Sequence, residues 1–260
     1  MAATMKMEDR KELLKEYFDA VQNKDVKGFM KQCIETIPDY WFNVPASSSG
    51  KYHPNYALGN GGLMRHTIAM LRFFERLVRN ELYGKSFTKK ELDLLRVACL
   101  MHDSRKSGSD EDFKKSKYTR FDHPILAADV VRSIKTKFIS DKEKEIIATA
   151  IESHMGQWNT DASKRFKVVL PLPKNKYQKI VHLVDYLAAM KGCEITFDNF
   201  SLLSENKGRN DSATIDTYVF PFGKYVGMKL VDVNKEHPNY IAWAKKNIES
   251  EPLKTLLTQL

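Results

Sequence analysis

Cysteine is scarce in this chain, and the cysteines that occur lie far apart. The 260 residues include three of them, Cys33, Cys99 and Cys193. Their number and spacing exclude a disulfide framework and a CxxC metal-binding motif. We therefore expect a protein of the reducing cytoplasm, where thiols stay free.

Long apolar runs are also missing. No stretch reaches the roughly 18 consecutive apolar residues that a membrane span needs, so we expect no membrane partner. The first residues, MAATMKMEDRKELL, lack the apolar segment and cleavage site of a secretion signal. Hydrophobic residues still make up 42% of the chain, enough for the core of one large domain, or of one domain with a small appendage.

Positive charge is in moderate excess. The chain has 42 basic and 33 acidic residues, which gives a formal net charge of +9. Basic proteins attract polyanions and charged phosphates. A solvated surface explains the same excess equally well. The charge is therefore consistent with a nucleic-acid or nucleotide substrate without indicating which.

Apolar spacing and capping signals predict a mostly helical fold. Thr88 with Glu91 and Ser140 with Glu143 form capping boxes, and Pro124 suits the first position of a helix. Together with apolar periodicity, they predict two helices within 9–36. They predict further helices over 62–80, from 88 to about 102, from 124 onward, from 140 to about 154, and over 176–192. Breaker residues and polar composition predict loops over 44–60, 104–122 (mobile) and 156–175.

The last part of the chain has a different composition. Residues 201–214 are polar and predict a linker. The segment 219–230, VFPFGKYVGMKL, has aromatic and β-branched residues around two glycines and predicts a short hairpin. A helix over 238–249 follows. We expect an all-helical domain over 1–200 and a small α+β module over 215–260.

A His-Asp doublet, His102-Asp103, lies at the end of one apolar helix and is the centre of a wider pattern. Histidine nitrogens and carboxylate oxygens are the ligands of hydrolytic metal sites. One such histidine alone is more simply a core or surface residue, so the joint pattern carries the argument. Its strings are GGLMRHT (61–67), LMHDSRK (100–106), FDHPILAA (121–128), ESHMGQW (152–158) and HLVDYLAAM (182–190).

Asp185 is unusual because its helix is otherwise strongly apolar. Ile180, Val181 and Val184 give the helix a face that we expect to be buried. A carboxylate near that face is costly unless it is paired or binds a cation. An ion pair with lysine or arginine is the alternative to metal ligation.

These motifs resemble the HD superfamily of metal-dependent phosphohydrolases, which uses His…His-Asp…Asp. GGLMRHT, preceded by KYHP (51–54), is similar to the start of the HD domain in certain 3′→5′ exoribonucleases, and the resemblance covers about residues 50–195. It implies a first metal ion on His66, His102, Asp103 and Asp185. It implies a second on His123 and His154, with Asp103 between the two. Lys106, in the HD-x-x-K position, would join Asp103 in catalysis by contacting a phosphate oxygen or the attacking hydroxide.

Two departures from the family pattern bear on the number of ions. Many two-metal relatives have paired histidines where this chain has His154-Met155. Methionine is a poor ligand for hard or borderline metal ions. Relatives often have a glycine just before the lysine, where this chain has Arg105. We therefore expect one or two divalent ions, which could be Mn, Co, Ni, Fe, Mg or Zn.

Substrate contacts are expected from the loop 104–122 and from one tryptophan. Trp158 could stack on a base or simply pack. The loop side chains could bind phosphate or form a solvated surface, and they are Arg105, Lys114, Lys115, Lys117 and Arg120. Cys99 is expected to pack, and His182 to be an ordinary helix residue.

The tail also carries a resemblance. FPFGKYVGMKL…HPNYIAWAKKN looks like a short module of some phage and bacterial proteins, sometimes attached to exonucleases. The preferred function is a phosphodiesterase or a 3′→5′ exonuclease-like activity on nucleic acid. The alternatives are a nucleotide phosphohydrolase acting on mono- or triphosphates, and a nucleic-acid-binding or regulatory protein with a structural metal site. The oligomeric state cannot be inferred from these features.

Overall fold

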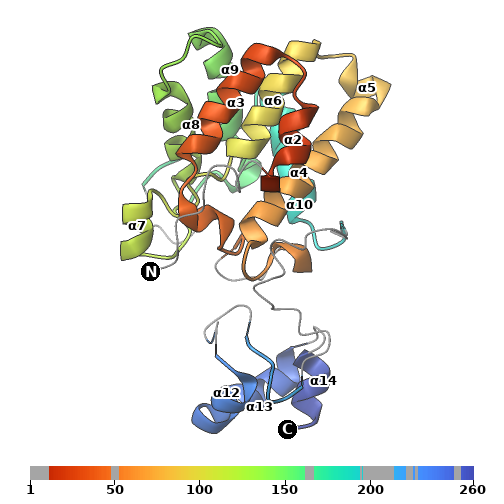
Figure 1. Cartoon of the computed structure of the whole chain (residues 1–260). Coiled ribbons are helices and arrows are strands. Elements are labelled where there is room, and N and C mark those ends of the chain that lie inside the picture. The colour runs from red at the N-terminus through yellow and green to blue at the C-terminus, as the bar shows by residue number, and fades with distance from the viewer. Residues whose placement is uncertain are drawn as a thin grey trace.

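The computed structural model of the chain is mostly helical (Figure 1). It describes residues 12–47, 53–161, 167–193, 195, 214–220, 225, 228–248 and 253–260. Within these ranges there is no strand, only isolated β-bridges. None of the helices in these ranges is long and apolar enough to cross a membrane.

The larger unit is a bundle in which α4, α6, α9 and α10 pack together, with α8 against α9 and α3 against α6. Its α-helices are α2 (Lys15–Ala20), α3 (Lys24–Thr36), α4 (Gly62–Arg79), α5 (Glu81–Gly84), α6 (Lys89–Met101), α7 (Asp110–Lys115), α8 (His123–Ser133), α9 (Asp141–Glu152) and α10 (Lys176–Ala189). Its 3-10 helices are η1 (Asp39–Phe42), η2 (Asn55–Ala57) and η3 (Gly156–Trp158).

The predicted capping signals determine where several of these helices begin. Thr88 and Ser140 each form the expected capping box, at the start of α6 and α9. Pro124 lies in the first turn of α8, where its missing N–H costs no hydrogen bond. Asn175 caps α10 in the same way, with Gln178 as its partner. The starts of α6, α9 and α10, and that of α8 with the ligand candidate His123, are thus positioned by local sequence.

The segment 104–122, which composition predicts as a loop, contains a short helix that the prediction did not include. This helix is α7, which Ser109 and Asp112 cap reciprocally. Tyr40 anchors the segment, because its ring stacks on Phe113 at 4.4 Å and its hydroxyl donates to the Gly108 carbonyl at 2.8 Å. Contacts between residues distant in sequence hold this short helix in place, so local composition did not predict it.

The C-terminal residues form a hydrophobic cluster of their own. α12 (Leu230–Glu236), α13 (Pro238–Asn247) and α14 (Leu253–Thr258) enclose it with Tyr218 and Phe220. The sequence predicted α13 but not α12 or α14. Of the predicted hairpin, one antiparallel bridge between Val219 and Lys229 is described.

Several predictions for this region remain untested. The turn of the expected hairpin, residues 221–224 and 226–227, lies outside the described residues, as do residues 201–213 of the expected linker. The α+β character of the module and the division of the chain at about residue 200 remain predictions.

Candidate metal centre

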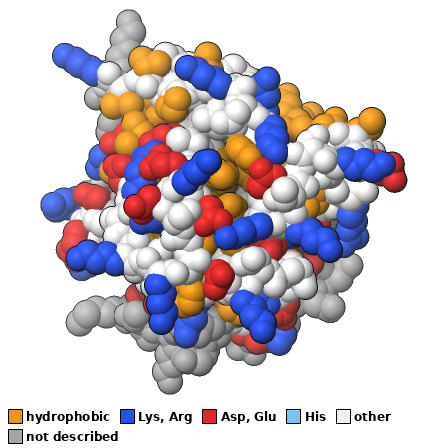
Figure 2. Space-filling model, turned by 90° about the horizontal axis from the view of Figure 1, so that it is seen from above, with side chains coloured by type: hydrophobic (Ala, Val, Ile, Leu, Met, Phe, Trp, Pro, Cys, Tyr) orange, Lys and Arg blue, Asp and Glu red, His pale blue; other side chains and the backbone are white. Residues whose placement is uncertain are grey.

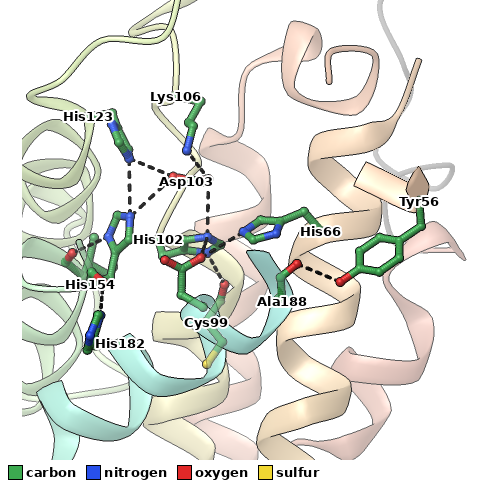
Figure 3. A network of polar contacts seen from close by, with 12 residues as sticks. Tyr56, His66, Cys99, His102, Asp103, Lys106, His123, His154, His182 and Ala188 are labelled. Carbon is green, nitrogen blue, oxygen red and sulfur yellow. Dashed lines mark hydrogen bonds and ion pairs between the residues drawn. The ribbon is translucent and has the colours of Figure 1, made fainter. Parts of the chain in front are cut away.

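Side chains from five helices or their ends converge on one buried polar site (Figure 3). His66 comes from α4, the doublet His102-Asp103 follows α6, and His123 begins α8. His154 follows α9, and Asp185 lies in α10. The four histidines and Asp103 are at most 1% exposed, whereas the side chain of Asp185 is 17% exposed.

Asp103 lies between two groups of these ligand candidates. Its Oδ1 is 2.9 Å from Nε2 of His123 and 3.6 Å from Nε2 of His154. Its Oδ2 is 3.4 Å from Nε2 of His102. Each oxygen of one carboxylate therefore faces a different set of imidazoles, as in a carboxylate that bridges two ions.

The group around Oδ2 is completed by Asp185 and His66. Oδ1 of Asp185 lies 2.9 Å from Nε2 of His66 and 3.5 Å from Nε2 of His102. The ligand atoms of His66, His102 and Asp103 all lie within 4.8 Å of one another, and so do those of Asp103, His123 and His154. The structure thus brings together all six residues that the sequence suggested as ligands.

Backbone carbonyls fix the orientation of three of the imidazole rings. Nδ1 of His102 donates to the carbonyl of Cys99 at 2.8 Å. In the same way, Nδ1 of His123 donates to Arg120 at 2.5 Å, and Nδ1 of His154 to Ile151 at 2.7 Å. A ring that donates from Nδ1 can present an unprotonated Nε2 to a metal, which is how protein histidines are oriented as ligands.

Several buried polar atoms at the centre of the site have no hydrogen-bond partner among the described residues. They are Nε2 of His102, Oδ1 of Asp103 and Nδ1 of His66. An unsatisfied buried polar atom costs about 1–3 kcal/mol. A divalent ion would satisfy atoms such as His102 Nε2 and Asp103 Oδ1, and the nitrogen and oxygen donors suit Mn, Fe, Co, Ni or Zn. The residues present therefore fit a metal site.

The electrostatics of the site favour a cation. Burial acts to raise the pKa of Asp103, but the positive charges of Lys106 and His102 outweigh it and hold this pKa well below its usual range. Burial also acts to raise the pKa of Asp185, but hydrogen bonds from His102 and His66 outweigh it and hold this pKa well below its usual range. Burial lowers the pKa of His154 to about 3, so its imidazole is neutral at physiological pH. The site thus combines two carboxylates with a neutral imidazole donor.

Lys106 contacts the same carboxylate from the outer side. Its Nζ lies 2.8 Å from Oδ2 of Asp103, and its side chain is 13% exposed. The backbone carbonyl of Lys106 accepts a hydrogen bond from the N–H of Arg120, which closes the loop 104–122 on itself. The lysine charge is therefore held at the site by a structured loop.

The other expected substrate residues of this loop are less closely tied to the site. Lys114 is exposed and pairs with Glu111 at 2.9 Å, and Arg120 makes two hydrogen bonds to Asp122. Lys115 and Lys117 are exposed, and Arg105 is partly buried. Lys114 and Arg120 thus pair with acidic residues of the same loop, and a substrate role for these five side chains stays a prediction.

Two further histidines belong to the surroundings of the site. His182 was expected to be an ordinary helix residue, but its Nδ1 donates to the backbone carbonyl of the ligand candidate His154 at 2.7 Å (Figure 3). The ring of His53 lies edge-on to that of His66, with centroids 5.3 Å apart. Two features of the sequence indicated that these histidines lie near the site. His182 is one turn before Asp185, and His53 is part of the KYHP string.

Comparison with known proteins agrees with this geometry. The family model of the HD domain matches residues 63–190, a range that includes all six ligand candidates and Lys106. The 3′-5′ exoribonuclease YhaM of Geobacillus sp. (strain WCH70) is 25% identical over 192 residues, covering 72% of this chain and 54% of the relative. The chain thus spans about half the length of that relative. No solved structure matches the chain.

The family match and the geometry support the same conclusion. The family model covers the residues from α4 to α10 that build the buried His/Asp site. Residues 63–190 of this chain form an HD domain.

Proposed function

We propose that this protein is a phosphohydrolase that uses one or two divalent ions to cleave phosphodiester bonds, with a 3′→5′ exonuclease-like activity on nucleic acid. One observation carries the proposal. Two buried ligand groups, His66–His102–Asp103 and Asp103–His123–His154, share a single carboxylate. Paired metal ions held in this way are a common device for displacement at phosphorus.

The residues that would hold each ion follow from the contacts. His66, His102 and Asp185, with Oδ2 of Asp103, would hold the first ion, and His123 and His154, with Oδ1 of Asp103, the second. When bound, such ions supply Lewis-acid polarisation of the phosphate and a water whose pKa falls toward about 7. No serine or cysteine nucleophile is then required, and Cys99 is a buried packing residue.

Lys106 would orient and neutralise the substrate. Its ammonium group lies 2.8 Å from Oδ2 of Asp103, and its side chain keeps 13% of its surface exposed. It therefore provides a positive charge next to the ligand group, where a phosphate oxygen approaching that group would pass. Positioned cationic groups stabilise the negative charge that develops on the phosphate during displacement.

The preference for a nucleic-acid substrate rests on two supports. The relative named above is an exoribonuclease, and the chain has a net charge of +9. The face in Figure 2 shows lysine and arginine side chains interleaved with acidic ones rather than a continuous basic tract. We therefore place the polymer contacts near the site and in residues 215–260 rather than over that face.

The test is a substrate panel with purified full-length protein loaded with Mn²⁺, Co²⁺ or Mg²⁺. The panel contains single-stranded RNA, single-stranded DNA, cyclic nucleotides, and free mono- and triphosphates. We expect mononucleotide products released stepwise from the 3′ end of an oligonucleotide labelled at its 5′ end. Rapid hydrolysis of free nucleotides without any cleavage or binding of oligonucleotides would contradict the proposal and favour a nucleotide phosphohydrolase.

Matched variants assign any activity to this site. Asp103→Asn should abolish hydrolysis of every substrate in the panel. Asp141→Asn is the control, because Asp141 is an exposed carboxylate that pairs with Lys144 on the surface. Binding of oligonucleotides without hydrolysis of any substrate under any metal would instead support a regulatory nucleic-acid-binding protein.

A further inference from the structure

Two exposed aromatic rings are stacked on each other beside the candidate metal centre. Trp158 is 50% exposed and Tyr186 is 37% exposed. Their ring centroids are 5.7 Å apart and their planes are inclined by 28°. Large exposed aromatic surfaces are costly in water and often mark binding sites. This pair, which we call the aromatic platform, is not explained by packing of the core.

Hydrogen bonds and a β-bridge fix the backbone that follows Trp158. Residues 159 and 170 are joined by two hydrogen bonds, from the Leu170 N–H to the Asn159 carbonyl at 2.8 Å and from the Asn159 amide to the Leu170 carbonyl at 3.1 Å. Thr160 and Val169 form an antiparallel bridge. A ring mounted on such a segment loses little conformational entropy when a ligand stacks on it.

The aromatic platform is connected to the ligand group through His182. Nδ1 of His182 donates to the carbonyl of His154, and its ring centroid lies 6.5 Å from that of Trp158 and 6.4 Å from that of Tyr186. Tyr186 also directly follows Asp185 in α10. The platform is therefore built on the same two segments that supply one ligand candidate to each side of Asp103.

A charged side chain on the same helix indicates what the aromatic platform binds. Lys179 is exposed, and it lies one turn before His182 and two turns before Tyr186, which places it on the same side of α10. Flat aromatic surface next to an ammonium group suits a base with its phosphate. An apolar segment of a protein partner would leave this charge without a counterpart.

We propose that Trp158 and Tyr186 form a stacking platform for an unpaired nucleobase of a single-stranded nucleic acid whose phosphodiester lies at the Asp103 site. This inference rests on the proposed function and adds a substrate class to it. Stacking recognises the face that all bases share, so the platform binds single strands with little sequence preference. It excludes a duplex, whose bases are already stacked on their neighbours.

The experiment measures binding of a fluorescent single-stranded oligonucleotide to full-length protein that carries Asp103→Asn to prevent turnover. A second oligonucleotide of equal length and charge has abasic sites in its 3′ half. In this background Trp158→Ala should weaken binding of the normal oligonucleotide by about ten-fold, while Trp158→Phe retains most of the affinity. Binding of the abasic oligonucleotide should be weak already and unchanged by Trp158→Ala.

The matched control is Tyr83→Ala, which removes a comparably exposed tyrosine (44%) from α5. We expect it to bind both oligonucleotides as the parent does, whereas Tyr186→Ala weakens only the normal one. Equal affinity of the parent and Trp158→Ala for the normal oligonucleotide would overturn the inference. If Trp158→Ala instead changes the mass of the protein in solution and leaves binding unaltered, the surface is a contact between copies, and the inference is again wrong.

A wrong proposed function would give a different result. The wild-type protein would then not hydrolyse methyl 4-nitrophenyl phosphate, a diester without a nucleobase, with any of the metals. The aromatic platform predicts that Trp158→Ala in the otherwise wild-type protein keeps the circular dichroism spectrum and the metal content of the wild type. Loss of helical signal or of metal together with loss of oligonucleotide binding would mean that Trp158 supports the fold or the metal site, and would contradict a role in base stacking.

Discussion

Nδ1 of His182 donates a hydrogen bond to the backbone carbonyl of His154 at 2.7 Å. Gly156 makes this approach possible. Its φ is +54°, and a Cβ at this position would lie 2.1 Å from Cε1 of His182. The turn after α9, which carries a ligand candidate, is thereby fastened to α10, which carries Asp185. Both the missing side chain and the left-handed conformation of Gly156 are needed.

Gly156→Ala should therefore disturb the site without touching a ligand. The added methyl group would displace the His182 ring, and the positive φ adds strain of about 1 kcal/mol or more. We expect a lower melting temperature and loss of metal from the His123–His154 side. Thermal unfolding and elemental analysis measure the two effects. Gly192→Ala is the control, since a Cβ there meets nothing within 4 Å. Wild-type behaviour of Gly156→Ala would refute the coupling.

The number of bound ions tests the bridging role of Asp103. If His123 and His154 hold a second ion, the metal-saturated protein should contain about two ions per chain. His154→Ala should reduce this number to about one and leave the first group occupied. Equilibrium dialysis followed by elemental analysis gives the stoichiometry. Saturation of the wild-type protein at one ion would rule out the two-metal arrangement and indicate that Met155 marks a one-metal variant of the family pattern.

Metal binding should release protons. Burial acts to lower the pKa of His102, but Asp103 and Asp185 outweigh it and raise this pKa to about 10. The metal-free protein then carries a proton on His102 at neutral pH, and an ion must displace it. Metal affinity should consequently rise with pH up to about 10 and fall as the pH is lowered.

Calorimetric titration with Mn²⁺ at pH 7, in two buffers of different ionisation enthalpy, measures this release. We expect about one proton per chain from His102. The Asp141→Asn variant serves as the control and should release the same number. An identical heat of binding in both buffers would show that no proton leaves and that His102 is already neutral in the metal-free protein.

The C-terminal residues should contribute to polymer binding but not to chemistry. Their buried side chains form a cluster separate from that of the HD domain. Removing residues 215–260 should therefore leave hydrolysis of a small phosphodiester nearly intact. Oligonucleotide binding should weaken, with a shallower dependence on salt, because fewer counterions are released when fewer lysines contact phosphates. An unchanged salt dependence would mean that residues 215–260 contact no phosphates.

Local sequence predicted the helices that carry the site with good accuracy. The expected helix from Gly62 to Asn80 is α4, Gly62–Arg79, and both predicted capping boxes are present. These elements were predictable because apolar periodicity and capping act within a few residues. The convergence of the histidines and aspartates could be anticipated because the motif resemblance carried information that no single helix contains.

The features that sequence reasoning missed depend on contacts between distant segments. α7 is held by Tyr40, whose ring stacks on Phe113, and nothing in its polar composition indicates that contact. The stacking of Trp158 on Tyr186 joins residues on two different segments. His182 can approach the backbone of His154 because Gly156 has no side chain. In the sequence, the glycine that follows His154-Met155 was the feature that could have indicated this contact.

The most direct test of the account is the metal content and activity of Asp103→Asn, compared with wild-type and Asp141→Asn protein. Asp103 belongs to both ligand groups, so its loss should affect every ion at the site. We predict that the wild-type and Asp141→Asn proteins retain Mn²⁺ through gel filtration and hydrolyse methyl 4-nitrophenyl phosphate. Asp103→Asn, folded by circular dichroism, should lose most of the metal and about a hundred-fold in rate. Full metal content and undiminished hydrolysis in Asp103→Asn would contradict the account.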